Sequence, residues 1–261
     1  MVITGLTRFV PLLAHPSKHV RTPGVFNKNC QSRNIDLVMV PLDVLPERLD
    51  QTVEALRHVV NLAGFVVTIP HKTKIAGYCD RLVGAAQVLN VCNVVRREPD
   101  GTLTGSMFDG EGFVEGLRQE GHNLIDKKAL LIGAGGAASG IAHALISRGI
   151  GSLVIANRSS EKAEQLAGLL REHFSGVEIK TGSSDPYEAD LIINGTSLGM
   201  HPRDGLPVDP TRLRPGTIVA EVVMQPDVTR LLKVSAERGC VIHKGIHMVR
   251  QQINLLVDFL N

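Results

Sequence analysis

Apolar and polar positions follow two different rhythms along the chain. Dense runs of Val, Ile and Leu predict buried strands, whereas apolar residues spaced three or four positions apart predict helices with one packed face. In the N-terminal part, a strand run at residues 36–44 is followed by a helical pattern at 46–60 and a second strand run at 63–69. This order predicts a β-α-β unit.

Two shorter β-rich runs come next, at residues 91–97 and 102–105. The turn sequence Glu-Pro-Asp-Gly at 98–101 separates them. Turn residues between two short strand runs are typical of a hairpin, whose strands pair antiparallel. The N-terminal sheet is therefore expected to be mixed rather than all parallel.

The C-terminal part begins with a helical pattern at 109–119 and then alternates between strand runs and helical patterns. Four strand runs are found here, at 129–132, 152–156, 189–193 and 217–223, and the clearest helical patterns between them are 138–148 and 160–172. Such alternation predicts a doubly wound parallel sheet. A last amphipathic stretch, 248–260, is expected to pack back onto the N-terminal part.

These patterns predict an α/β protein of two domains. At 261 residues the chain exceeds the usual size of a single hydrophobic core, although an α/β barrel would also fit this length. We place an N-terminal mixed-sheet α/β domain at residues 1–108, completed by a C-terminal helix at 246–261. A Rossmann-type domain with a doubly wound parallel sheet is placed at 109–245.

Composition and charge narrow the classes of partner. The net charge of +2 argues neither for nor against an acidic partner, but the scattered Lys and Arg residues and the aromatic content of 3% argue against nucleic acid. No apolar run reaches the roughly 18 residues needed to cross a bilayer, and the first residues lack the features of a signal peptide. We therefore expect a cytoplasmic protein that acts on a small molecule, without a nucleic-acid or membrane partner, and a homodimer is a candidate assembly.

Cysteine and histidine positions predict no metal site. The four cysteines form no C-x-x-C pair, so neither a zinc site nor a disulfide framework is indicated. His243 and His247 have the i,i+4 spacing that can hold a metal on a helix, but no acidic residue stands in the same segment. Free thiols and metal-free histidines are the expectation.

A glycine-rich turn is the strongest local motif. The strand run at 129–132 leads directly into G-x-G-x-x-A at 133–138, and a helical pattern follows. Glycine lets the backbone turn tightly and lets a pyrophosphate approach, while the N–H groups at the helix start offer donors and a partial positive charge. We predict dinucleotide binding rather than a purely structural glycine turn, with these cofactor residues: Gly133, Ala134, Gly135, Gly136 and Ala137.

The residues that follow the next strand run, 152–156, bear on the choice between NAD and NADP. A carboxylate there would bind the ribose diol of NAD, but Asn157 occupies the expected position. Arg158 can stack on adenine or pair with a 2′-phosphate, which favours NADP, whereas Glu161 brings a negative charge close to that phosphate. The predicted cofactor is NAD or NADP, with a slight preference for NAD because of Glu161.

A second motif lies at residues 64–72, where an apolar strand ends in Pro70, His71 and Lys72. Here the sequence resembles the shikimate dehydrogenase family, whose N-V-T-x-P-x-K signature ends in the catalytic lysine. The resemblance covers nearly the whole chain. It continues at Asn93, at 105–110 with Asp109, at the glycine turn, at 157–159, at 194–200, and at Gly245, Met248 and Gln252.

The resemblance implies a catalytic domain at the N-terminus, completed by the C-terminal helix, a Rossmann domain between them, and an active site in the cleft. It also implies that Lys72 and Asp109 act as a pair on the hydroxyl that is oxidised. The substrate-binding residues that it implies are Thr22, Thr68, Asn93 and Gln252. Beyond the glycine turn, the implied cofactor residues are Asn157, Arg158, Ser159, Asn194, Thr196, Ser197, Leu198, Met224 and Gly245.

The chemistry of the pair can be argued from the residue types. A hydride leaves the carbon only as the hydroxyl proton is removed, so a group that accepts and returns this proton is required. An ordinary lysine is protonated at neutral pH; desolvation favours its neutral form, whereas a nearby carboxylate favours the charged one. We hypothesise that Lys72 is the general acid/base and that Asp109 orients it and shares its proton.

Several positions depart from the family pattern. The family usually binds the substrate carboxylate with two serines in S-x-S-P, whereas this chain has V-R-T-P at 20–23. Val66 replaces the signature asparagine, Met224 replaces a tyrosine, and residues 107–108 replace a polar pair. Each hydrogen bond lost by a buried ligand costs about 1–3 kcal/mol. Arg21 could instead grip a carboxylate, or it is a surface arginine.

We therefore predict a divergent NAD(P)-dependent oxidoreductase that interconverts shikimate and 3-dehydroshikimate, or acts on a related hydroxylated cyclic carboxylate. Quinate and aminoshikimate are the nearest alternative substrates. Two alternatives come from other functional classes: a ligand-sensing homologue without catalysis, and a dehydrogenase of the methylenetetrahydrofolate type. The presence of both Lys72 and Asp109 argues against them.

Overall fold

The computed structural model describes residues 2–261. It divides into two compact units, which we call unit 1 and unit 2. Unit 1 consists of the chain up to Phe108 together with Gln252–Asn261, and unit 2 is Asp109–Gln251. The division into domains with a second boundary after Gly245 stays a prediction. Along residues 2–261, no helix combines the length and the apolar character needed to cross a lipid bilayer.

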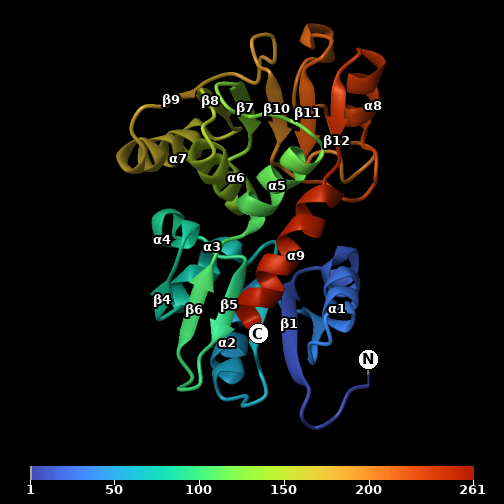
Figure 1. Cartoon of the computed structure of the whole chain (residues 1–261). Helices are drawn as coiled ribbons and strands as arrows, with labels where there is room; N and C mark the ends of the chain where they lie inside the picture. The colour runs from blue at the N-terminus through green and yellow to red at the C-terminus, as the bar shows by residue number, and fades with distance from the viewer. Residues whose placement is uncertain (1) are drawn as a thin grey trace. The chain divides into compact units, whose positions relative to one another are not determined.

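Unit 1 is built on a six-stranded sheet with the strand order β2-β1-β3-β5-β6-β4 (Figure 1). Its strands are β1 (Arg8–Ala14), β2 (Leu37–Asp43), β3 (Gly64–Val67), β4 (Arg81–Leu82), β5 (Val94–Arg97) and β6 (Leu103–Ser106). β1 pairs in parallel with β2 and β3, whereas β5 is antiparallel to β3 and β6. The mixed sheet and its hairpin, predicted from the turn at 98–101, are confirmed.

The helices of unit 1 cover this sheet. They are α1 (Thr22–Ser32), α2 (Leu49–Arg57), α3 (Lys72–Ile75), α4 (Ala85–Leu89) and the C-terminal part of α9 (Ile246–Leu260). α1 is fixed to β2 because the Asn27 amide exchanges two hydrogen bonds with the backbone of Met39, at 2.7 and 3.0 Å. The end of α9 is held by Arg8, which donates to the carbonyl oxygen of Leu260 at 3.1 Å. Fully buried Phe26 and Phe65 fill the core of the unit.

Unit 2 is a six-stranded, entirely parallel sheet with the order β12-β11-β10-β7-β8-β9. Its strands are β7 (Lys128–Ile132), β8 (Ser152–Ala156), β9 (Glu178–Thr181), β10 (Leu191–Asn194), β11 (Ile218–Glu221) and β12 (Val241–His243). Its helices are α5 (Asp109–Gln119), α6 (Gly136–Ser147), α7 (Ser160–His173), α8 (Arg230–Glu237) and the start of α9.

This strand order confirms the predicted doubly wound sheet. The chain builds outward from β7 through β8 to β9, and then returns to the other side of β7 to add β10, β11 and β12. Loops that leave the carboxyl ends of β7 and β10 therefore diverge, and in folds of this kind that point is where a ligand binds. Buried Leu130, Ile192 and Val219 form part of the core behind it.

Candidate active site

In unit 1, the carboxyl ends of three parallel strands meet at one edge of the sheet. The chain leaving β2 stays attached to β1, because the N–H of Val44 donates to the carbonyl oxygen of Ala14 at 2.9 Å. The chain leaving β3 does the same, because the N–H of Thr68 donates to Leu13 at 3.0 Å. Thr68, a predicted substrate residue, and Lys72 thus follow directly from this edge.

His71 fixes the turn that carries Lys72. Its side chain is buried, and its Nε2 lies 2.9 Å from the carbonyl oxygen of Val44. Burial lowers the pKa of His71 despite this hydrogen bond, so the ring is neutral at neutral pH and Nε2 carries the proton that the carbonyl accepts. Its backbone N–H donates to Thr68 at 2.9 Å, which closes the turn from which α3 begins at Lys72. Motif reasoning missed this role, for which the only signal is the position next to Lys72.

Asn93 and Gln252, both predicted to bind substrate, are in direct contact. The Asn93 amide nitrogen donates to Oε1 of Gln252 at 3.2 Å, and both side chains are buried. The Asn93 amide oxygen accepts from the backbone N–H of Phe108 at 2.9 Å. This second bond fixes the backbone immediately before Asp109, the predicted partner of Lys72.

The segment that departs from the family pattern leads into α1. Thr22 is the first residue of this helix and is almost fully buried, whereas Arg21 is exposed. Upstream of it, Asp43 accepts from the ring Nδ1 of His15 and from the backbone N–H of Ser17, both at 2.8 Å. The hydrogen bond from the Ser17 N–H holds the pKa of Asp43 below its usual value, and the one from His15 adds to this effect. Through these two hydrogen bonds Asp43 shapes the loop before α1, a role that the sequence did not reveal.

In unit 2, the glycine turn after β7 packs against the turn after β10. Gly133 has φ of +117°, and a Cβ atom there would lie 3.1 Å from the backbone of Gly195. A Cβ on Gly195 would in turn lie 3.0 Å from the Cβ of Ala138. The small residues at these positions let the two loops approach each other at the point where the strand order reverses.

Gly135 differs from these two glycines. Its φ is −91°, which any residue adopts, and a Cβ placed on it would meet no atom within 4 Å. The protein itself therefore does not require glycine here. Gly135 also caps α6 without a side-chain hydrogen bond, so the first N–H groups of the helix are left for another acceptor. A bare backbone at an uncapped helix start is what an approaching pyrophosphate requires.

At the end of β8, the predicted ribose residues are organised by their own loop. The Asn157 side chain donates to the carbonyl oxygen of Ser159 at 2.9 Å, and the Ser159 hydroxyl caps α7 by accepting from the N–H of Lys162 at 3.4 Å. Glu161 accepts from Gln165, one turn along α7, at 3.4 Å. Arg158 is exposed, and within residues 2–261 no carboxylate forms an ion pair with it.

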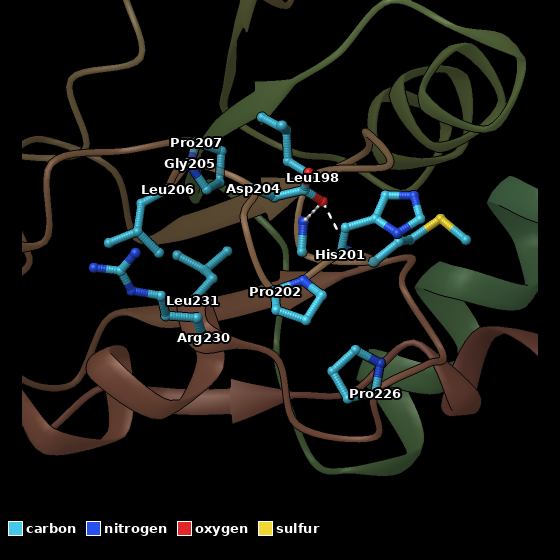
Figure 2. Close-up of a pocket in the computed structure, with 12 residues that line it drawn as sticks. Leu198, His201, Pro202, Asp204, Gly205, Leu206, Pro207, Pro226, Arg230 and Leu231 are labelled. Carbon is cyan, nitrogen blue, oxygen red and sulfur yellow. Dashed lines mark hydrogen bonds between the residues drawn. The ribbon is translucent and has the colours of Figure 1, made fainter.

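The loop after β10 is shaped by Asn194. Its amide oxygen accepts from the N–H and hydroxyl of Thr196, at 3.2 and 2.6 Å, and its amide nitrogen donates to the carbonyl oxygen of Leu198 at 2.9 Å. Further along, Asp204 accepts from the backbone N–H groups of Gly199 and His201, at 2.9 and 3.0 Å (Figure 2). The structure thus brings the predicted cofactor residues Asn194, Thr196 and Leu198 together.

The same loop borders a cavity of about 310 Å³ (Figure 2). Its other wall comes from Pro226 and from Arg230 and Leu231 at the start of α8. Leu198 is the only predicted site residue in its lining. The predicted cofactor residue Gly245 lies elsewhere in unit 2, against the end of β11, where a Cβ on it would lie 2.4 Å from the carbonyl oxygen of Val223, the residue before Met224.

The structure also places the two histidines with metal-ligand spacing. The rings of His243 and His247 stack with their centroids 4.6 Å apart, rather than converging on a common point. Among residues 2–261, no group of three or more His, Cys, Asp and Glu side chains has the geometry to hold a metal ion.

Comparison with protein families gives two matches. The model of the shikimate dehydrogenase substrate binding domain matches residues 12–95, and that of shikimate / quinate 5-dehydrogenase matches residues 116–200. The first stretch lies in unit 1 and the second in unit 2.

Individual proteins are similar over nearly the full length. A shikimate dehydrogenase (NADP(+)) from Rubrobacter xylanophilus is 38% identical over 259 residues, which cover 96% of this chain and 89% of that protein. The crystal structure of shikimate 5-dehydrogenase from Listeria monocytogenes, in complex with shikimate and NAD, is 31% identical with a TM-score of 0.87, covering 99% of this chain and 93% of that one. A 5-ketofructose reductase of Gluconobacter sp. is 28% identical with a TM-score of 0.85, covering 97% and 92% of the two chains.

Proposed function

The chain belongs to the shikimate dehydrogenase family, and on that premise we propose that it transfers hydride between NAD(P) and a ring hydroxyl of shikimate or a related hydroxylated cyclic carboxylate. As a member of this family it is an NAD(P)-dependent oxidoreductase. Its reaction interconverts the ring alcohol and the corresponding ketone.

One observation carries the proposal furthest, namely the open backbone at Gly135. The nicotinamide of a bound NAD(P) would supply the acceptor or donor of the hydride. Gly135 leaves room for the pyrophosphate, and the uncapped start of α6 offers it N–H donors. Gly133 and Gly195 let the flanking loops approach one another beside it.

Proton transfer falls to Lys72, with Asp109 as its partner. The ring alcohol must lose its proton as the hydride leaves, and the ketone must regain one in the reverse direction. We assign this acid/base role to Lys72, which starts α3 from the turn that His71 anchors. Asp109 starts α5, and the backbone just before it is fixed by Asn93. The carboxylate orients the ammonium group and shares its proton.

Substrate recognition relies on hydroxyl and amide groups. Thr68 follows the strand edge of unit 1, Thr22 begins α1, and Asn93 and Gln252 form a buried amide pair. Amides and hydroxyls can both donate and accept, which fits the hydroxyl groups of a ring substrate. Val20 has no side-chain donor, so the substrate carboxylate is left to Arg21 and Thr22.

Position 20 also supports a second candidate substrate. Val20 has no hydroxyl where the family has a serine, and a chain 28% identical to this one is a 5-ketofructose reductase. A substrate without a carboxylate would not need the missing serine. Reduction of such a polyhydroxy ketone is therefore the alternative to be tested beside shikimate and quinate.

For the cofactor we propose NADP rather than NAD. The sequence alone hardly separates NAD from NADP, and Glu161 slightly favours NAD. In the folded chain Glu161 is engaged by Gln165, whereas Arg158 is exposed and unpaired by any carboxylate of residues 2–261. A free guanidinium beside the ribose site favours a 2′-phosphate. The similar protein from Rubrobacter xylanophilus also has NADP(+) in its name.

The test is a panel of shikimate, quinate and 5-ketofructose, each with both dinucleotides, followed through the absorbance of the reduced nicotinamide. We expect the highest kcat/KM for shikimate with the NADP couple. Full efficiency on 5-ketofructose and none on the carboxylates would favour the second candidate. Tight binding of ligands without any turnover would contradict both and favour a sensor.

A further inference from the structure

Glu221 is a buried carboxyl group at the carboxyl end of β11. It is the last residue of that strand, pairs in register with Asn194 of β10, and is 0% exposed to solvent. The three residues before it in β11 are apolar or small. Burying a carboxyl group away from water at the end of such a strand costs folding free energy. The contacts of the Glu221 side chain show what this buried group does in the structure.

Glu221 is held by one hydrogen bond, from a residue that caps a neighbouring helix. Its Oε2 accepts from the hydroxyl of Thr229 at 2.9 Å, and the pairing of β10 with β11 places Asn194 directly beside it. Its Oε1 has no hydrogen-bond partner among residues 2–261. Burial raises the pKa of Glu221 to about 7, and the hydrogen bond from Thr229 only partly offsets this.

Through its bond to Thr229 and its pairing with Asn194, Glu221 reaches the β10 loop, which we define as residues 194–199. Asn194 begins the loop and holds Thr196 and Leu198 through three hydrogen bonds. At the other end, Gly199 has φ of +102°, and a Cβ placed there would lie 3.3 Å from the side chain of Thr229. Thr229 is itself fixed, because its hydroxyl caps α8 by accepting from the N–H of Leu232 at 3.3 Å.

We propose that Glu221 is a positioning residue for the dinucleotide, which holds the β10 loop in its binding shape by lying beside Asn194 at one end and bonding Thr229, which lies against Gly199, at the other. This inference rests on the proposed function, in which the β10 loop contacts the cofactor. Glu221 acts through these two neighbours and touches neither the substrate nor the reacting atoms.

The role depends on an acceptor at this point. Removing the side chain would leave the Thr229 hydroxyl with an unsatisfied donor in a buried place, free to turn to another partner. Glutamine keeps the volume and one acceptor oxygen in the position of Oε2, so it can receive this hydrogen bond. Glu221→Ala therefore removes the acceptor for the Thr229 hydroxyl, whereas Glu221→Gln keeps it.

The experiment measures NADPH binding to the full chain by fluorescence titration, without substrate. Loss of the hydrogen bond to Thr229 should raise the Kd of Glu221→Ala by about tenfold, whereas Glu221→Gln should stay within about twofold of the wild type. Ser235→Ala is the matched control, because this hydroxyl of α8 is fully buried and has no partner among residues 2–261. Its Kd should not change, even if its Tm does.

Hydrogen exchange of the free protein gives a second readout that needs no ligand. The amides of the β10 loop should exchange faster in Glu221→Ala than in Glu221→Gln or Ser235→Ala. Wild-type exchange in this loop and a wild-type Kd in a folded Glu221→Ala variant would overturn the proposal, as would equal weakening by alanine and glutamine. If the wild type binds NADPH but leaves shikimate unchanged, the proposed substrate fails, and the binding data still decide the role of Glu221.

Discussion

The ring of His71 is tied to the backbone of Val44 by a hydrogen bond of 2.9 Å between Nε2 and the carbonyl oxygen. This bond joins the turn after β3 to the end of β2, two strands that both flank β1. Lys72 follows His71 directly and begins α3. The position of the proposed acid/base therefore depends on a neighbour that takes no part in the chemistry.

His71→Leu removes this bond while nearly keeping the volume of the side chain. The unpaired carbonyl of Val44 should lower the free energy of unfolding by about 1–3 kcal/mol, and a displaced Lys72 should lower kcat by roughly tenfold to a hundredfold. Urea titration and steady-state kinetics check the two effects. A variant that loses stability but keeps wild-type kcat would show that His71 does not position Lys72.

Lys72→Ala tests the acid/base itself. Loss of a general acid/base lowers kcat by roughly a hundredfold to ten-thousandfold, and the Kd for the dinucleotide should stay unchanged because the glycine turn is untouched. Lys74→Ala is the control, since Lys74 is exposed and lies on the same short helix. If Lys72→Ala turns over substrate as fast as Lys74→Ala, the assignment is wrong.

Arg158→Ala tests the proposed preference for NADP. The loss of a charge-assisted contact with the 2′-phosphate should raise KM for NADPH by roughly tenfold to a hundredfold, with little change for NADH. Arg171→Ala provides the comparison, because Arg171 is also exposed but already bonds Glu164 on α7 at 2.7 Å. Equal loss for both dinucleotides would point to adenine stacking by Arg158 instead of phosphate recognition.

The sequence predicted regular elements well and irregular ones poorly. The helix at 109–119 and the strand at 152–156 have the bounds of α5 and β8. β1 went unassigned because Pro11 interrupts its apolar run, yet this strand pairs along its whole length with β2. β9 and β12 also went unassigned. They are short strands at the two edges of the sheet, where partial exposure removes the apolar signal.

At the candidate site, motifs identified residues but not their contacts. Asn93 and Gln252 are far apart in the sequence, and their hydrogen bond exists only because the end of α9 belongs to unit 1. Glu161 accepts a hydrogen bond from the side chain of Gln165, on the next turn of α7, which the motif did not show. His71 and Glu221 act through backbone and side-chain partners that no local pattern specifies.

His243 makes stability depend on pH. It is 1% exposed, and burial lowers its pKa to about 3, with His247 and His122 lowering it further. The unfolded chain, with a histidine pKa of about 6.5, then binds more protons, so stability falls as the pH drops below about 6.5. At about pH 5 this one group should cost about 2 kcal/mol relative to neutral pH.

His243→Leu removes that dependence, because leucine has no proton to gain. The difference in unfolding free energy between the wild type and His243→Leu should therefore shift by about 2 kcal/mol between pH 7 and pH 5, in favour of the variant at low pH. Urea titration at each pH measures it. His58→Ala, at an exposed position, should follow the wild-type curve. Parallel curves for His243→Leu and the wild type would mean that His243 takes up protons equally in the folded and the unfolded protein.

Gly105 is required by its neighbours rather than by its backbone. A Cβ on this residue of β6 would lie 2.6 Å from the sulfur of Cys92 and 2.8 Å from that of Cys79, closer than real contacts allow. Both cysteines are free thiols. Gly105→Ala should therefore lower the free energy of unfolding by about 1–3 kcal/mol through overpacking.

Removing one sulfur should return part of that loss. In the double variant Gly105→Ala with Cys79→Ala, the new methyl group occupies space that the Cys79 sulfur has left, while Cys92 still crowds it from the other side. A double-mutant cycle by urea titration should give a favourable coupling of about 0.5–2 kcal/mol between the two sites. Cys30→Ala is the control partner, since Cys30 lies on α1 and should show no coupling to Gly105. Strict additivity of Gly105→Ala and Cys79→Ala would mean that β6 shifts as a whole and that the thiol pair is not what excludes a side chain there.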